Sequence, residues 1–159
     1  MTQSTYSVVM TTLFIDADAC PVTREAIAIA RAHSVSLVLV ANESQDLSRF
    51  TGRSGVETLQ VASGPDAADF AIVPLLTPVD IVVTGDIGLA AMVLGRGARA
   101  LSPRGRQYLS ATIDLELAVR HAEQKHRRKG GRTQGPSPFQ DEDRERFLEA
   151  LERLLTEHG

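Results

Sequence analysis

Five aspartates follow apolar segments that are typical of strands, or begin the helix that comes next. Asp16 and Asp18 directly follow a first apolar run, Asp86 follows a central one, and Asp66 and Asp69 begin a helical segment. Residues i and i+2 of an extended chain point the same way, and residues i and i+3 share one face of a helix. Clustered carboxylates repel each other unless a cation compensates them, and Mg²⁺ and Mn²⁺ prefer oxygen ligands. The pattern therefore predicts metal-assisted hydrolysis of a phosphate ester.

The same aspartates have a second interpretation, as caps of helices. Asp is a preferred N-cap residue, so Asp18 is a candidate to cap a helix that starts at Pro21. Asp86 is in the same way a candidate to cap the helix that follows Asp86. Asp66, with Asp69 three residues later, resembles a capping box. Both interpretations stay open for each residue alone. Their common position at the carboxyl ends of strands favours a shared site, because sites of open α/β sheets form there.

Three further residues after predicted strands are candidates to bind substrate. Asn42 follows the second strand, and Ser102 and Arg104 lie in a turn after the fifth. The guanidinium of Arg104 can bind a phosphate group with two hydrogen bonds, or pair with one of the strand-end aspartates. Asn42 is alternatively a turn residue.

Cys20 is the single cysteine of the chain and lies near a predicted helix N-terminus. The helix dipole would lower its pKa, whereas neighbouring carboxylates would raise it. We therefore expect Cys20 to pack as a small apolar residue rather than act as a nucleophile.

A basic run occupies residues 125–132 and begins with Lys125-His126-Arg127-Arg128-Lys129. Such a patch attracts a phosphate backbone, with an affinity that falls as salt rises. The alternative is a solvated helix end, because cations are favoured near a helix C-terminus.

Strands and helices alternate along the first two thirds of the chain. A first strand is predicted from Val8-Val9-Met10 and Leu13-Phe14-Ile15, ending at Asp16, and further strands at 37–40, 56–61, 80–84 and 98–101. Helices are predicted from Pro21, at 66–76 with a break at Pro74, at 89–94, at 113–126 and at 141–157. This alternation predicts a three-layer α/β/α fold with a mostly parallel sheet, followed by a C-terminal helix. Right-handed crossovers place all the strand C-termini at one edge.

The composition sets limits on the class of protein. The chain has 159 residues, a net charge of −3, one Cys and 4% aromatic residues. It predicts a single domain over 10–159, an N-terminal extension at 1–9 and a basic, linker-like loop at 125–138. Few aromatic residues argue against a stacking platform for single-stranded nucleic acid. Without a transmembrane stretch or signal peptide, the expected location is the cytoplasm.

The string Phe14-Ile15-Asp16-Ala17-Asp18-Ala19-Cys20-Pro21 resembles the opening signature of the YaiI/YqxD family of uncharacterised bacterial proteins. The similarity continues through Val40-Ala41-Asn42, Gly64-Pro65-Asp66-Ala67-Ala68-Asp69, Thr84-Gly85-Asp86-Ile87-Gly88-Leu89-Ala90, Pro103-Arg104-Gly105, Gly135-Pro136 and the helix with Asp143-Arg144 and Phe147. It departs from the family pattern at Ser102, where an Asn is usual, and at Gln134, which interrupts a usual Thr-Gly-Gly-Pro.

The resemblance implies a PIN-like fold, in which the acidic edge of a parallel sheet binds divalent metal in nucleases. Asp16 then matches the first strand-end carboxylate and Asp86 the one after the central strand. Asp18 and Asp69 are further candidate ligands, and the choice between Asp66 and Asp69 stays open.

The leading prediction is a phosphodiesterase, specifically a ribonuclease, that depends on Mg²⁺ or Mn²⁺. In it Asp16, Asp18, Asp69 and Asp86 hold the metal and Arg104 positions a phosphate, with RNA or another phosphate-bearing ligand as partner. The alternative is a non-catalytic protein that binds RNA or a nucleotide.

A third possibility is a haloacid-dehalogenase-like phosphatase, because Asp16-x-Asp18 resembles the first motif of that family. That family needs a further acidic residue shortly after its last Gly-Asp, whereas Asp86 is followed by Ile87-Gly88-Leu89-Ala90-Ala91. This departure disfavours the phosphatase.

Overall fold

The computed structural model describes residues 10–18, 20–42, 48, 50, 52–62, 64, 66–133, 135 and 137–157. The predicted N-terminal extension, residues 1–9, lies outside them. Within these ranges, no helix has both the length and the apolar character needed to cross a membrane.

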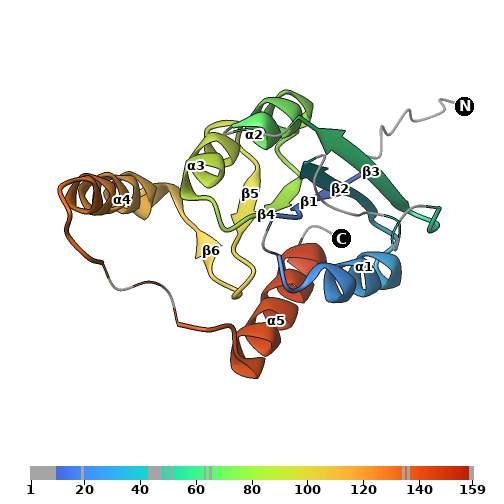
Figure 1. The fold of residues 1–159 in the computed structure, drawn as a ribbon. Coiled ribbons are helices and arrows are strands. Elements are labelled where there is room, and N and C mark those ends of the chain that lie inside the picture. The colour runs from blue at the N-terminus through green and yellow to red at the C-terminus, as the bar shows by residue number, and fades with distance from the viewer. Residues whose placement is uncertain are drawn as a thin grey trace, which may run out of the picture.

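One six-stranded sheet forms the centre of the fold, in the order β3-β2-β1-β4-β5-β6 (Figure 1). Its strands are β1 Thr12–Asp16, β2 Ser36–Asn42, β3 Val56–Val61, β4 Ile81–Val83, β5 Arg99–Leu101 and β6 Gln107–Tyr108. The first five strands pair in parallel, as predicted, and β6 adds antiparallel to β5. The two-residue β6 was not predicted, because a strand this short has no visible period.

Helices cover both faces of the sheet, which confirms the three-layer α/β/α architecture. Leu13 and Ile15 of β1 pack in one core, under α1 and α5, whereas Phe14 packs in the other, under α2, η1 and α3. Successive side chains of a strand point to opposite faces, so the three central residues of β1, Leu13 to Ile15, are all apolar and buried. The helices are α1 Thr23–Ala32, α2 Ala67–Ile72, the 3₁₀ helix η1 Val73–Leu75, α3 Ile87–Gly95, α4 Ser110–Arg128 and α5 Asp141–Glu157.

Two predicted helix boundaries need comment. The first helix begins at Thr23, so Pro21 precedes it by two residues rather than starting it. The predicted break at Pro74 is confirmed, because the chain changes there from α2 to η1. Pro lacks the N–H that a continuing α-helix needs.

Helix α4 extends away from the three layers (Figure 1), and of its 19 residues Ile113 alone is buried. It is longer than the predicted 113–126, and the linker-like loop expected at 125–138 is wrong at its start. Residues 125–128 form the last turn of α4. Lys, Arg and Gln are good helix formers, and cations stabilise a helix C-terminus, so the basic run prolongs the helix.

Candidate functional site

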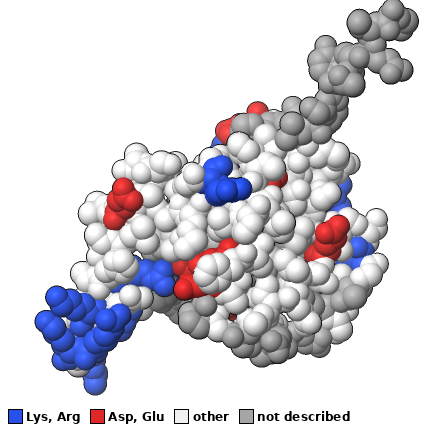
Figure 2. Space-filling view, turned by 90° about the horizontal axis from the view of Figure 1, so that it is seen from above, with Lys and Arg blue, Asp and Glu red and all other residues white. Residues whose placement is uncertain are grey.

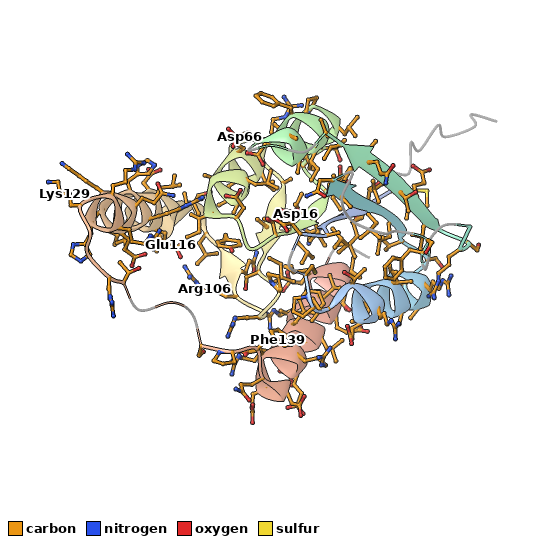
Figure 3. The ribbon with its side chains drawn as sticks, in the orientation of Figure 1. Asp16, Asp66, Arg106, Glu116, Lys129 and Phe139 are labelled. Atoms are coloured by element: carbon orange, nitrogen blue, oxygen red, sulfur yellow. The ribbon has the colours of Figure 1, made fainter. Side chains whose placement is uncertain are left out.

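The five aspartates line one cavity of about 160 Å³ at the carboxyl edge of the sheet, here called the acidic pocket. Asp16 is the last residue of β1, and Asp86 follows β4 by three residues. Asp69 comes from α2, and Asn42, the last residue of β2, lines the same cavity. Figure 3 shows Asp16 near the middle of the molecule beside β1 and Asp66 beside α2. The parallel sheet thus brings together aspartates that are up to 70 positions apart in the sequence, as the rule for strand ends predicts.

Asp16 is fixed by hydrogen bonds within the pocket. The hydroxyl of Thr84 donates to its Oδ2 at 2.9 Å, and the backbone N–H of Asp18 donates to its Oδ1 at 3.4 Å. Burial raises the pKa of Asp16, and the charges of Asp18 and Asp86 act in the same direction, against these two hydrogen bonds. Thr84 is fully buried, and its role was not predicted from the sequence. Its position two residues before Asp86 was the available signal.

Asp69 is the most perturbed carboxylate of the pocket. Its exposed fraction is 5%, and its pKa is raised to about 6, first by burial and then by the charges of Asp86, Asp66 and Asp16. Asp66 is exposed and has a left-handed backbone, with φ of 67°. Both residues line the acidic pocket, and Asp69 is the buried one of the two. Burial and the neighbouring carboxylates thus both disfavour the charged form of Asp69.

Capping explains one of these aspartates. The Oδ1 of Asp86 accepts the N–H groups of Gly88 at 2.8 Å and Leu89 at 3.3 Å, so Asp86 caps α3 as the second interpretation predicted. The capping predictions for the other two helices are wrong, because α1 and α2 have no side-chain cap. The N-cap of α1 is Val22, since the helix starts later than the sequence indicated.

Arg120 of α4 is a site residue that was not predicted from the sequence. Its Nη1 lies 2.9 Å from Oδ1 of Asp86. It lines a second cavity, of about 430 Å³, together with Asp16, Asp18 and Gly85. No local pattern links Arg120 to Asp86, because 34 residues separate them and only the docking of α4 on α3 brings them together.

The donor atoms of the acidic pocket suit a hard divalent cation in kind but are not arranged around one point. They are carboxylate oxygens, with the side chain of Asn42 beside them. Among the residues that the structure describes, no three His, Cys, Asp or Glu side chains are placed so that they could hold a metal ion together. Asp86 is engaged by α3 and by Arg120, which leaves Asp16, Asp18 and Asp69 as the remaining candidate ligands of the predicted set.

The predicted substrate residues divide between two cavities. Asn42 lines the acidic pocket, whereas Ser102 and Arg104 line a third cavity of about 520 Å³, here called the arginine–aromatic pocket. The residues that line this pocket are Pro21, Gly85, Ser102, Pro103, Arg104, Arg106, Tyr108 and Phe139. Arg104 pairs with Asp143 of α5 at 3.2 Å, instead of the strand-end partner that the sequence suggested. Gly85 lines both this pocket and the Arg120 cavity.

Ser102 organises the turn that carries the arginines. Its Oγ accepts the backbone N–H of Arg104 at 3.3 Å and that of Arg106 at 3.1 Å. The predicted turn is confirmed by the hydrogen bond from Gly105 N–H to the carbonyl of Ser102 at 3.0 Å. Ser102 thus positions both guanidinium-bearing residues along one wall of the arginine–aromatic pocket.

Cys20 packs against the core under α1 and α5, as predicted. Burial raises the pKa of its thiol, which opposes a nucleophilic role.

The basic residues at the end of α4 are exposed, Lys125 and Arg127 to Lys129 among them. Figure 2 shows a dense group of Lys and Arg atoms at one end of this view, and a group of acidic atoms near the centre of the same face. The two groups of opposite charge can thus be approached from one side.

Comparison with known proteins places the chain in a family. Residues 14–157 match the model of the family described as "Uncharacterized BCR, YaiI/YqxD family". A UPF0178 protein of Exiguobacterium sibiricum is 41% identical over 145 residues, which cover 91% of this chain and 96% of that protein. A UPF0178 protein of Parvibaculum lavamentivorans is 42% identical over 143 residues, which cover 90% and 92%. No solved structure matches the chain. With nearly its whole length matched, the chain belongs to the uncharacterised YaiI/YqxD family.

Proposed function

We propose that this protein is a divalent-metal-dependent phosphodiesterase that cleaves RNA at the acidic pocket. The observation that carries this proposal is the shared cavity of five aspartates, in which mutual repulsion contributes to raising the pKa of Asp69 to about 6. A fold retains such repulsion at a cost in stability, and a bound cation removes it.

The residues of the acidic pocket and its neighbourhood have different roles in this proposal. Asp16, Asp18 and Asp69 would hold Mg²⁺ or Mn²⁺ once their side chains turn toward a common point, because they are not placed around one in this structure. Asp86 would join them when Arg120 releases it. Thr84 keeps one oxygen of Asp16 oriented through its 2.9 Å hydrogen bond. Arg120, once released, binds the phosphate that enters. The ion, when bound, supplies water activation and neutralises charge on the phosphate.

Helix α4 favours a polynucleotide over a small phosphate ester. Arg120 pairs with Asp86 of the acidic pocket, and Arg127 lies seven residues farther along the same helix. Seven residues are close to two turns, so both side chains lie on one face of α4, about 10 Å apart along its axis. A phosphate backbone that follows this face leads from the exposed basic end to the carboxylates.

The decisive experiment compares cleavage of a labelled single-stranded RNA with Mn²⁺ and with EDTA, in the wild type and in Asp16→Asn. We expect Mn²⁺-dependent cleavage that falls about 100-fold or more in Asp16→Asn, because changes in the second shell of metal ligands alone cost ~10–100-fold. Asp114→Asn is the matched control, since Asp114 is exposed on α4. Calorimetric titration with Mn²⁺ should show the same difference between the variants.

Two results would contradict this function. Full cleavage by Asp16→Asn would remove the acidic pocket from the reaction. Saturable, salt-sensitive RNA binding without turnover would instead support the non-catalytic binding protein, an alternative favoured by the lack of a preassembled metal site among the described residues.

A further inference from the structure

The arginine–aromatic pocket has the size and composition of a ligand site. Its volume of about 520 Å³ lies within the ~300–1,000 Å³ that is usual for small-molecule pockets. Two arginines and two of the chain's seven aromatic residues line it. Its walls come from distant parts of the chain: Gly85 after β4, the turn and strand at 102–108, and Phe139 before α5.

The two guanidinium groups of the pocket lie over its rings and are held by carboxylates. The Cζ of Arg104 is 5.8 Å from the ring centroid of Phe139, and that of Arg106 is 5.8 Å from the ring centroid of Tyr108. The Cζ of Arg144 in α5 lies 5.3 Å from the same Phe139 centroid, so a base that packs on this ring takes the place of one guanidinium. Arg104 also pairs with Asp143. Arg106 pairs with Glu116, and Figure 3 shows these two side chains close to each other. Arg104 also donates from Nη1 to the hydroxyl and from Nη2 to the carbonyl of Ser137. A guanidinium has five N–H donors, so these partners still leave donors on Arg104 and Arg106 for phosphate oxygens.

This combination matches the two parts of a nucleotide. A planar base packs on aromatic rings and guanidinium planes, and a phosphate accepts hydrogen bonds from arginines. A simple phosphate would use the arginines without the rings, and an apolar ligand would use the rings without the arginines.

A hydrogen-bonded connection links this pocket to the acidic pocket. The hydroxyl of Tyr108 donates to the backbone carbonyl of Thr84 at 3.1 Å, and the side chain of the same Thr84 donates to Asp16. The next residue, Gly85, lines both the arginine–aromatic pocket and the Arg120 cavity. A ligand in the arginine–aromatic pocket is therefore next to the carboxylates.

From these observations we infer that the arginine–aromatic pocket binds one nucleotide of a single-stranded polynucleotide, its base against Phe139 and its phosphate at Arg104 and Arg106. The adjoining phosphodiester then lies at the acidic pocket, a second step that rests on the proposed function. A base has to leave its helical stack to enter such a pocket, so single strands are the substrate class.

The test measures binding of 5′-AMP in EDTA by calorimetry, with adenosine, ribose 5-phosphate and inorganic phosphate as partial ligands. We expect 5′-AMP to bind more tightly than each of the three. Phe139→Ala and Arg106→Ala should each weaken binding about tenfold, because stacking on an aromatic side chain is worth ~1–3 kcal/mol per base. Phe70→Ala and Arg96→Ala are the matched controls, since both residues are exposed and line none of the three cavities.

Phe139 packs partly against a core, so Phe139→Leu is included to preserve the fold while removing the ring. Absence of 5′-AMP binding at millimolar concentration, or equal binding by the wild type and both Phe139 variants, would overturn the inference. Equal binding of inorganic phosphate and 5′-AMP would do so as well, because the base would then contribute nothing.

The same variants separate this inference from the proposed function. Asp16→Asn should bind 5′-AMP like the wild type, whatever its cleavage activity. Failure of 5′-AMP binding with cleavage intact overturns the nucleotide pocket alone. If cleavage occurs, single-stranded RNA should be cut about tenfold faster than a duplex, and equal rates would refute the placement of the adjoining phosphodiester.

Discussion

The acidic pocket and the arginine–aromatic pocket each depend on a buried aspartate, and the two aspartates ionise in opposite ways. Asp69 and Asp143 are both 5% exposed. Burial and three neighbouring carboxylates raise the pKa of Asp69 to about 6. The N–H of Gln140, followed by Arg146 and Arg104, keeps the pKa of Asp143 below its usual value despite its burial. Equal exposure thus produces opposite effects, because the neighbours differ in charge.

The two regions differ in how many donors surround the buried aspartate. Asp143 receives hydrogen bonds or ion pairs from Arg104, Arg146 and the backbone of Gln140, and it anchors the start of α5. Within the described part of the chain, the carboxylates of the acidic pocket have one arginine partner, Arg120, which pairs with Asp86. The first arrangement stabilises the fold, and the second is suited to a ligand that brings positive charge.

The largest expected effect on stability concerns the packing behind the arginine–aromatic pocket. Gly105 has φ of 86°, and a Cβ there would lie 2.4 Å from the backbone carbon of Arg146 in α5. Gly105→Ala should cost more than about 3 kcal/mol, because the left-handed conformation alone costs ~1–2 kcal/mol for an L-residue. Thermal unfolding should show a loss of about 10 °C.

Gly130→Ala is the matched control for this substitution. Its φ is 84°, but no atom lies within 4 Å of the added Cβ. It should lose only about 3 °C. An equal loss of thermal stability in the two variants would show that the close contact between the turn at Gly105 and α5 does not stabilise the arginine–aromatic pocket.

The next effect tests the uncompensated charge of the acidic pocket. Because the folded-state pKa of Asp69 is raised from 3.8 to about 6, its contribution to stability is full below pH 3.8 and is lost as pH rises through about 6. In EDTA the wild type should therefore be less stable at neutral pH than at pH 4.5. Asp69→Asn should therefore gain stability relative to the wild type between pH 4.5 and 7.5, as measured by urea unfolding.

Mn²⁺ should remove this advantage by stabilising the wild type at pH 7.5 more than Asp69→Asn. A difference between the two proteins that is the same at both pH values would contradict the assignment of Asp69 as the strained carboxylate. In the same titrations Asp143→Asn should lose stability at neutral pH, since the lowered pKa of Asp143 marks a favourable charge.

The smallest effect concerns the basic end of α4, outside both pockets. Replacement of Lys125, Arg127 and Arg128 by Gln should weaken RNA binding about tenfold at low salt and reduce its salt slope by about 2. Binding is measured in EDTA by fluorescence anisotropy. The control replaces Arg24, Arg31 and Arg153, which are exposed on α1 and α5. An identical loss of RNA affinity in both triple variants would show that the basic end of α4 acts only through the overall charge of the protein.

Much of the fold was predictable because it depends on local patterns. Continuous apolar runs such as Ile81–Val83 indicated strands covered on both faces, and Pro74 marked the end of an α-helix. The basic, glycine-containing run at 125–132, followed by the linker-like 133–138, predicted a loop from residue 125. Helix propensity, which these residues also satisfy, extended α4 to Arg128 instead.

The acidic pocket could be predicted from the order of residues alone, since each aspartate comes after a strand or begins a helix, and parallel strands end at one edge. The partners of Asp86 and Arg104 could not. Arg120 and Asp143 reach them across 34 and 39 residues, through the docking of α4 and α5. The arginine–aromatic pocket has the same origin, because Phe139 and Tyr108 meet only when α5 packs against the turn at Gly105. Local patterns specify which residue type stands at the end of each strand, and only the packed chain decides which distant side chains share a cavity.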